Sequence, residues 1–390
     1  MSRIIVDSLR GNSASSDAIT LANDGTCTAN ITNNLSNRNL LINGDHRIAQ
    51  RGTAAVTATT TASYKCVDRW KTDIDGSSGG DFSHAQSTDV PTGQGFTHSS
   101  KITTVTQVSQ PSGTTNKHQL YTMLEKQDVA HLEWGTSDAK TCTISFWVKS
   151  SVTGTYLFYL KYYGATNYSY YTNYTINSAD TWEKKTITIT GHTSGGKVSG
   201  TTDVGLMIEW GLGYGSGFET GTLNEWTTSD TQRLASGSVY LPEHSGATWY
   251  LTGCQFEVGS IATDYEFKSY AQELALCQRY CYVIPVTDDD FIGNVSGYAH
   301  STTNLKGVFH LPQVMRAYPT YTGTNTAARA RAGNTGANFD LDTLTVGYGD
   351  STNPNPTAWG FTVTTSSVTG GQGILLQGQA SGSITFDAEL

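Results

Sequence analysis

The stretch Thr141-Cys142-Thr143-Ile144-Ser145-Phe146-Trp147-Val148-Lys149 indicates the fold class, because apolar residues recur in it at every second position. Cys142, Ile144, Phe146 and Val148 would share one face of an extended chain. This alternation is typical of a β-strand with one buried face. The sequence therefore predicts a sheet here rather than a helix.

Further strand patterns follow along the chain. Residues 156–163 and 168–176 surround Gly164-Ala165-Thr166-Asn167, a turn sequence that predicts a hairpin. Residues 182–190 and 204–210 continue the alternation. Several such strands within about 200 residues predict a two-sheet sandwich.

The composition points the same way. Only 15% of the 390 residues are charged, and the chain contains 41 Gly and 21 Tyr, which is typical of an all-β protein with many turns. The length fits two or three domains. The net charge of −9 offers no basic surface to nucleic acid, so nucleic acid is not an expected partner. No run approaches the roughly 20 apolar residues of a membrane helix, so membrane insertion is not expected.

Neither a secretory signal nor a cysteine framework is predicted. Residues 1–21 carry charged side chains and no apolar core segment, so we expect the protein to fold in the cytoplasm of the cell that makes it. The six cysteines include no Cys-x-x-Cys pair, and their spacing fits neither a zinc site nor a disulfide scaffold. We expect most of them to be buried thiols.

Four regions follow from these patterns. Residues 1–38 hold short strand candidates but are too few to bury a core, so they must pack across subunits or on a partner. Residues 39–267 are the jelly-roll candidate, residues 268–282 a connecting helix, and residues 283–390 a C-terminal β domain that would form the tip.

The connecting helix has its own sequence signals. Ser269 and Gln272 form a capping-box pattern, and the apolar side chains recur at helical spacing. Cys277 and Cys281, four residues apart, would share one face of this helix. Such a helix between two β domains would suit a trimer axis or a docking element.

Two segments of the jelly-roll candidate resemble a known family. Leu40-Leu41-Ile42-Asn43-Gly44-Asp45 and the aromatic strand from Trp249 to Ser260, with its Gln-x-Glu-x-Gly-Ser ending, resemble the first and last strands of carbohydrate-binding-module-like jelly rolls. The following segment, Glu273–Tyr280, is similar to the one that joins this domain to the distal tip in many bacteriophage appendage proteins.

Both ends of the chain extend the resemblance. Ser2–Asp7 resembles the anchoring ends of fibre proteins from marine phages. Met315–Thr320 and Ile384–Leu390 are similar to segments of phage fibre tips. The resemblance implies a protein of the virion, a tail fibre or receptor-binding adhesin, that forms a homotrimer, attaches to other virion proteins through residues 1–38 and contacts host surface polysaccharide.

The sequence is also compatible with other functions. A head-attached fibre or decoration protein would have the same fold but would attach to the capsid instead of the tail. A glycan-cleaving depolymerase and a free carbohydrate-binding module are the alternatives from other classes. Glu209, Glu219 and Glu225 lie near aromatic residues, and glycoside hydrolysis needs a pair of carboxylates. No catalytic motif accompanies them, so we predict a protein that is not an enzyme and uses no cofactor.

Aromatic residues are the candidates for glycan contact, because their rings can stack on pyranose faces while a hydroxyl group bonds sugar oxygens. The tyrosines of the predicted hairpin must be divided among the core, subunit contacts and ligand contacts, because one face of each strand is core. A second aromatic cluster begins at Trp210 among glycines, as binding loops often do. The candidates are Tyr162, Tyr163, Tyr168, Tyr170, Tyr171, Tyr174, Trp210, Tyr214 and Trp226. Trp70, Trp182 and Trp249 are assigned to the core.

No metal site is predicted. Asp288-Asp289-Asp290 is interpreted as a solvated acidic turn rather than a calcium site. By resemblance, Asp45 and Glu257 occupy positions where related modules often hold a structural calcium.

Overall fold

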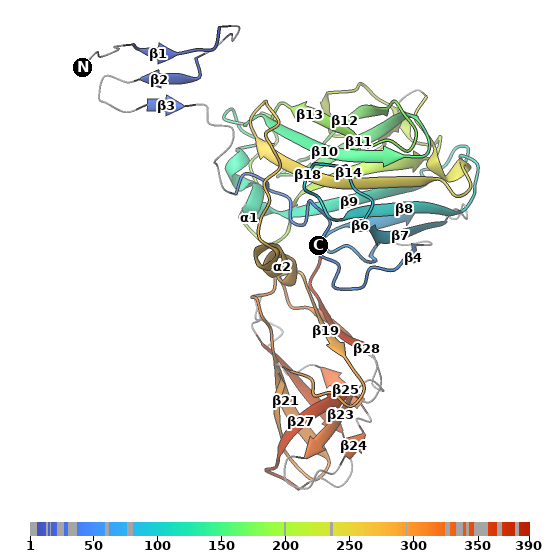
Figure 1. Ribbon diagram of the computed structural model, residues 1–390, viewed down its shortest axis with the longest axis vertical. Coiled ribbons are helices and arrows are strands. Elements are labelled where there is room, and N and C mark those ends of the chain that lie inside the picture. Colours follow the sequence, from blue (N-terminus) through green and yellow to red (C-terminus); the bar gives the residue numbers. More distant parts are fainter. Residues whose placement is uncertain are drawn as a thin grey trace.

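The computed structural model describes residues 6–12, 15, 17–21, 27–29, 37–58, 62–75, 81–198, 200–234, 237–293, 295–323, 328–332, 338–340, 343–346, 358–364, 369–378 and 382–390. The fold is all-β with one short helix between two β regions, as predicted (Figure 1). No helix in these ranges is long and apolar enough to cross a membrane.

Two antiparallel sheets make the central sandwich. The first has the strand order β13 (Glu183–Ile189), β10 (Cys142–Ser150), β18 (Thr248–Val258), β8 (Ser99–Thr106), β7 (Asp81–Ser87) and β4 (Val56–Ala58). The second has the order β16 (Trp226–Thr227), β12 (Asn167–Ile176), β11 (Gly154–Tyr163), β14 (Val204–Tyr214), β9 (Lys117–Glu125), β6 (Lys71–Asp75) and β5 (Ser63–Tyr64). We call them the six-stranded sheet and the seven-stranded sheet.

The core between these sheets confirms the predicted alternation. Phe146 of β10 packs against Phe158 of β11 and Trp210 of β14, with ring centroids 6.4 Å and 5.5 Å away. Trp70 and Trp249 are fully buried in the same cluster, as expected. The predicted hairpin is also present, because β11 and β12 pair from Gly154↔Ile176 to Tyr163↔Asn167.

Short elements complete the sandwich. They are the helix α1 (Lys126–Val129), the 3₁₀ turns η1 (Ala130–Leu132) and η2 (Leu241–Glu243), and the parallel pair β15 (Glu219–Thr220) and β17 (Gln232–Leu234).

The helix α2 (Tyr270–Gln278) follows the sandwich and has the predicted capping box between Ser269 and Gln272. It is shorter than the predicted helix of residues 268–282. Cys281 begins β19 (Cys281–Val286), which pairs with β28 (Gly382–Asp387). Because the backbone of Cys281 belongs to this strand pair, it cannot continue the helix. The expectation that Cys277 and Cys281 share a helix face was therefore wrong.

The C-terminal region contains two more sheets. One has the order β19, β28 and β22 (Thr320–Gly323). The other has the order β24 (Asn338–Asp340), β23 (Ala328–Ala332), β27 (Gly373–Gly378), β20 (Val295–Ala299), β21 (Asn304–His310), β26 (Ala358–Thr364) and β25 (Thr343–Val346). Phe309 and Phe386 are fully buried in this region's own core.

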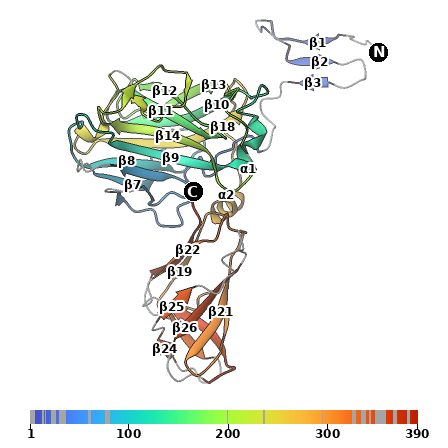
Figure 2. The ribbon, with the colours of Figure 1, turned by 180° about the vertical axis from the view of Figure 1, so that it is seen from behind.

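The N-terminal strands stand apart from the sandwich. β1 (Ser8–Leu9), β2 (Ile19–Leu21) and β3 (Cys27–Ala29) form a small antiparallel sheet, and both views show it separated from the body (Figures 1 and 2). Asn37 and Arg38 then bond to Glu266 and Asp264, where the chain joins the sandwich.

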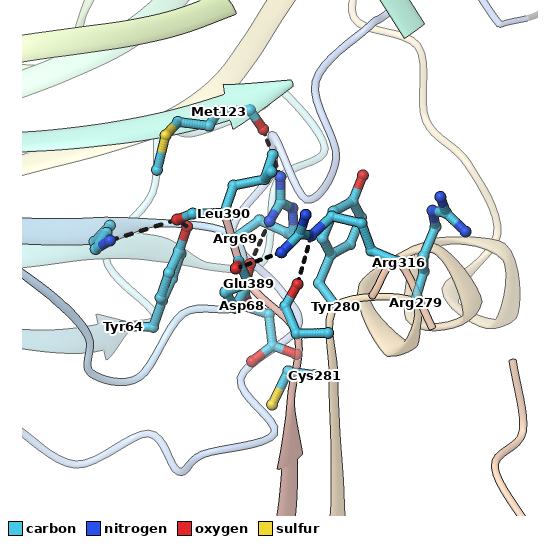
Figure 3. A network of polar contacts seen from close by, with 12 residues as sticks. Tyr64, Asp68, Arg69, Met123, Arg279, Tyr280, Cys281, Arg316, Glu389 and Leu390 are labelled. Carbon is cyan, nitrogen blue, oxygen red and sulfur yellow. Dashed lines mark hydrogen bonds and ion pairs between the residues drawn. The ribbon is translucent and has the colours of Figure 1, made fainter. Parts of the chain in front are cut away.

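The last residues of the sequence return to the sandwich after β28 leaves the C-terminal region (Figure 3). Glu389 pairs with Arg69, whose guanidinium also lies 3.5 Å from the centre of the Tyr280 ring. Arg316 donates to the carbonyl oxygens of Ala388 and Glu389 at 2.6 and 3.0 Å. We call this contact the tail lock.

Candidate functional site

The outer face of the seven-stranded sheet carries an aligned row of long side chains. In the strand register, Tyr159 of β11 lies opposite Glu209 of β14, and Glu209 lies opposite Tyr121 of β9. Neighbouring strands therefore place these three side chains on the same face. An outer sheet face is normally exposed, yet all three residues are buried.

Residues 215–234, which follow β14, cover this face, and we call them the covering segment. Phe218 packs on Tyr214 with ring centroids 5.5 Å apart. Further along, Arg233 places its guanidinium 3.8 Å from the centre of the Tyr159 ring. This segment covers part of the sheet face and leaves a pocket of about 380 Å³, within the range of ligand sites.

We call this the sheet pocket. Its lining residues are Asp73, Thr115, Lys117, Gln119, Tyr121, Lys161, Tyr163, Met207, Phe218, Asp230, Thr231 and Arg233.

A buried ion pair supports the sheet pocket. Nη1 of Arg233 lies 2.7 Å from both carboxylate oxygens of Glu209, which is fully buried. The Tyr214 hydroxyl donates to the same carboxylate. Although burial alone would lower the pKa of Arg233, the Glu209 carboxylate raises it above its usual range. Arg233 therefore stays charged and Glu209 is held as its counter-ion.

The other charges of the sheet pocket are paired as well. Nζ of Lys117 lies 3.3 Å from Asp73, and Lys161 pairs with Asp230. Asp230 also accepts a hydrogen bond from Ser169 at 3.0 Å. Although burial alone would raise the pKa of Asp230, its bonds to Lys161 and Ser169 hold the pKa below its usual range. The pocket thus presents polar groups with balanced charge.

Aromatic rings supply the apolar part of the pocket wall. Tyr163 is partly exposed, and burial raises the pKa of its hydroxyl to about 12, so it remains a neutral donor and acceptor at physiological pH. Tyr121 and Phe218 are nearly buried, with 6% and 9% of their surface exposed. Such a combination of ring faces and paired polar groups suits a polar ligand with apolar faces.

Most of the candidates for glycan contact lie in the interior, so for these residues the ligand-contact alternative is wrong. Tyr162, Tyr170, Tyr174 and Trp210 belong to the core between the sheets, because strand alternation turns them inward. Tyr171 and Tyr214 point outward but are buried in a second apolar cluster with Phe218 and Leu223 of the covering segment. Buried rings have no face for a sugar, so these six are structural.

The remaining three candidates are partly exposed. Tyr163 lines the sheet pocket. Tyr168 packs on His192, with ring centroids 3.7 Å apart, and Trp226 donates its indole N–H to the carbonyl of Thr190 at 2.8 Å. These two lie outside the lining of the sheet pocket, and their contact with a glycan stays a prediction.

Trp182 does not belong to the core as predicted. It is partly exposed and donates its indole N–H to Asp89 at 3.0 Å, on the outer side of the six-stranded sheet. Because it lies before the first residue of β13, strand alternation does not fix its direction.

Sequence patterns missed most of the lining residues. Arg233 and Asp230 lie in a segment without periodicity, and Lys117 and Gln119 belong to β9, which no expected strand included. A usable signal was the pattern of β14, where Glu209 interrupts an apolar run at a position expected to be half-buried. A buried carboxylate requires a cationic partner, although the sequence does not say which one.

Two of the glutamates considered for catalysis, Glu209 and Glu225, have described side chains, and neither lines the sheet pocket. Glu209 is the buried counter-ion of Arg233, and Glu225 is exposed. The side chain of Glu219 lies outside what the structure describes.

The positions considered for calcium have protein partners. Asp45 pairs with Arg47 at 3.1 Å, and Glu257 accepts hydrogen bonds from Thr263 and Gln255. In the described ranges no three His, Cys, Asp or Glu side chains come together as a metal site. Cys66, Cys142, Cys254, Cys277 and Cys281 are free buried thiols, as expected.

No protein-family model matches the sequence, and no curated protein matches it either. Among solved structures, the enzymatically active domain of tailspike protein 4 of bacteriophage CBA120 aligns with 57% of this chain at 10% identity and a TM-score of 0.30, and this chain covers 21% of it. The family 11 carbohydrate-binding module of Clostridium thermocellum Lic26A-Cel5E aligns with 53% of this chain at 12% identity and a TM-score of 0.25, with 97% of the module covered.

TmCBM61, solved in complex with β-1,4-galactotriose, aligns with 57% of this chain at 12% identity and a TM-score of 0.27, with 99% of that protein covered. At these identities and TM-scores the likeness assigns no ligand to this chain.

Proposed function

We propose that the protein binds glycans in the sheet pocket and acts as an adhesin on a phage particle, as a tail fibre or receptor-binding protein. The sheet pocket carries the first part of the proposal, because it combines a size suited to a small ligand with exposed ring surface and several polar side chains. The virion location, the attachment through residues 1–38 and the homotrimer are expectations from the sequence resemblance. A small N-terminal sheet that stands apart from the sandwich supports an attachment role.

The charge pattern favours an uncharged glycan. Lys117, Lys161 and Arg233 each have an acidic partner, so a charged ligand would have to compete with an existing ion pair. Sugar hydroxyl groups can instead donate hydrogen bonds to the carboxylates and accept them from the lysine and arginine side chains without breaking these ion pairs. Tyr163 offers its ring to the apolar face of a pyranose.

Binding to an array of surface polysaccharides tests this proposal. We expect Tyr163→Ala to weaken binding about tenfold or more, which corresponds to roughly 1.4 kcal/mol of lost stacking. Tyr298→Ala is the matched control, because Tyr298 is an exposed tyrosine of the C-terminal region, far from the lining of the sheet pocket. Equal binding by both variants and the unchanged protein would contradict the sheet pocket as the site.

The same samples separate adhesion from cleavage. An adhesin leaves the bound polysaccharide intact, whereas a depolymerase releases reducing ends with time. We expect no increase in reducing ends. Release that is lost in Glu225→Gln or Glu219→Gln would instead establish a depolymerase.

A further inference from the structure

The outer face of the six-stranded sheet contains a depression produced by a β-bulge. Ser145 of β10 lies opposite Gln255 of β18, but Trp147 lies opposite Thr252, so two residues of β18 face one residue of β10. One of these two is Gly253, which has a φ of +61°. A bulge bends its strand and redirects the neighbouring side chains, and bulges are frequent beside binding sites.

Gly253 lets the Phe96 ring pack directly on the backbone of β18 at the bulge. A Cβ atom at this position would lie 2.5 Å from Cζ of Phe96, so any larger residue would displace that ring. Phe96 packs against Tyr265 and Phe267, with ring centroids 5.1 and 5.3 Å away. These three rings form one wall of the depression, and the Phe96 ring covers the backbone of Gly253.

Trp147 lines the opposite side. It is partly exposed, and its cross-strand neighbour on the same face is Lys184 of β13. Throughout the part of the chain that the structure describes, the indole N–H of Trp147 donates to no protein acceptor, and its ring stacks on no other ring. Trp147, Phe96, Phe267 and Gly253 line a pocket of about 180 Å³, which we call the bulge pocket.

The polar groups around the bulge pocket are unpaired. Lys184, the carboxylate of Asp264 and the side-chain amide of Gln94 line it, and none of them bonds to another described side chain or backbone group. The sheet pocket differs in this respect, because its lysine and arginine side chains form ion pairs with acidic side chains. Unpaired donors and an acceptor around a ring are available to a ligand at no cost in existing contacts.

We propose that the bulge pocket is a second sugar-binding site, which takes one uncharged pyranose residue stacked on Trp147. The volume of about 180 Å³ equals that of about six water molecules at roughly 30 Å³ each, which limits the ligand to a single ring with its substituents. Lys184, Gln94 and the indole N–H donate to sugar oxygens, and Asp264 accepts from a hydroxyl. One cation and one anion balance each other, which selects a neutral sugar over an acidic one.

The two pockets lie on opposite sheets of the sandwich. One copy of the protein could therefore hold two glycan chains, or two sections of one chain. Linked weak sites raise the overall affinity without any new contact. The bulge pocket stands on its own observations, so its failure would leave the sheet pocket proposal untouched.

Saturation-transfer difference NMR on the full chain tests the second site. The probes are the methyl glycosides of glucose, galactose, mannose and N-acetylglucosamine at millimolar concentration, with glucuronic acid as the acidic comparison. The Tyr163→Ala background removes the contribution of the sheet pocket. In this background we expect at least one neutral probe to receive saturation, and Trp147→Ala to weaken that signal about tenfold. Trp147→Phe should recover part of the signal, because a smaller ring still stacks.

Lysine variants provide a second measurement that leaves Trp147 and Gly253 unchanged. In the Tyr163→Ala background, Lys184→Met should weaken the saturation signal of the same probe several-fold. Lys140→Met should leave this signal unchanged, because Lys140 is exposed and lies outside the pocket. Unchanged far-ultraviolet circular dichroism and thermal midpoint confirm that each variant is folded. In the Tyr163→Ala background, no saturation of any neutral probe, a signal that survives Trp147→Ala, or preferential binding of glucuronic acid would each overturn the proposal. The first two results would mean that the Lys184 stem and Trp147 only cover the sheet.

Discussion

At the scale of single residues, the buried pair of Arg233 and Glu209 determines the shape of the sheet pocket. It joins the segment that covers the sheet to the middle of β14, and both side chains are nearly or fully buried. A buried carboxylate that loses its counter-ion is costly, because water cannot replace the lost partner. The pair therefore holds the covering segment in place.

We expect Arg233→Met to lower the free energy of unfolding by about 3 to 5 kcal/mol, because it leaves Glu209 buried and unpaired. Lys161→Met is the comparison, since its partner Asp230 is 54% exposed and such pairs contribute about 1 kcal/mol or less. Urea denaturation measures both variants. Equal losses of unfolding free energy in the two variants would show that the buried Arg233–Glu209 pair stabilises the fold no more than an exposed pair does.

His84 links the stability of the fold to pH. This ring is fully buried, it lies 2.9 Å from the Ser100 hydroxyl, and burial lowers its pKa to about 3. Below pH 6.5 the unfolded chain binds a proton at this position and the folded chain does not, so stability is full above pH 6.5 and is lost as the pH falls. By about pH 5 the loss from His84 alone is about 2 kcal/mol.

Denaturation as a function of pH checks this expectation. The dependence between pH 7 and 5 should become shallower in His84→Gln and stay unchanged in His300→Gln, whose ring is exposed. Parallel curves for His84→Gln and the unchanged protein would show that His84 is not the source.

At the scale of elements, the tail lock joins the C-terminal region to the sandwich. Glu125 of β9 accepts hydrogen bonds from Arg279 at 2.8 and 2.9 Å and from Tyr280 at 2.6 Å, just after α2. Glu389 supplies the second connection through Arg69 (Figure 3). Two separate connections between the same two regions restrict rotation about the short helix between them.

We expect Glu389→Gln to destabilise the protein by about 3 kcal/mol or more, because Arg69 is 1% exposed and would lose its counter-charge. Glu225→Gln, at an exposed carboxylate, should have almost no effect. Thermal unfolding followed by calorimetry measures both variants. Replacing both partners, as Arg69→Met with Glu389→Leu, should recover part of the loss. A single Glu389→Gln variant as stable as the unchanged protein would contradict a structural role for the lock.

At the scale of the whole molecule, exposed apolar side chains gather beside α2. Phe267, Tyr270 and Val314 are 51%, 58% and 42% exposed. Phe267 and Val314 line a groove of about 600 Å³ next to the helix. Apolar surface of this kind is frequent at subunit contacts, which agrees with the proposed homotrimer.

We expect light scattering to give a solution mass of about 126 kDa, three times the 41.9 kDa of one chain. Tyr270→Glu should shift the mass toward the monomer, because it places a charge in the expected contact. Glu substituted for the exposed Tyr298 of the C-terminal region is the control. A monomeric unchanged protein would contradict the trimer and favour a free binding module or assembly on the particle alone.

The sequence by itself determined the all-β class, the 156–176 hairpin and the capping box before α2. Each of these depends on neighbours in the chain, namely alternation along a strand, a turn sequence, and a side chain that bonds the backbone three residues away. Alternation also divided the hairpin tyrosines between two faces, as Tyr162 and Tyr171 show.

Only the tertiary structure decided which outward residues reach solvent. The covering segment buries Tyr171 and Tyr214 and leaves Tyr163 in a pocket, and the segment has no periodic pattern that would place it there. Arg233 and Glu209 are 24 residues apart, and Arg69 and Glu389 are 320 residues apart. Contacts between such distant residues depend on how the whole chain packs, so no local pattern encodes them.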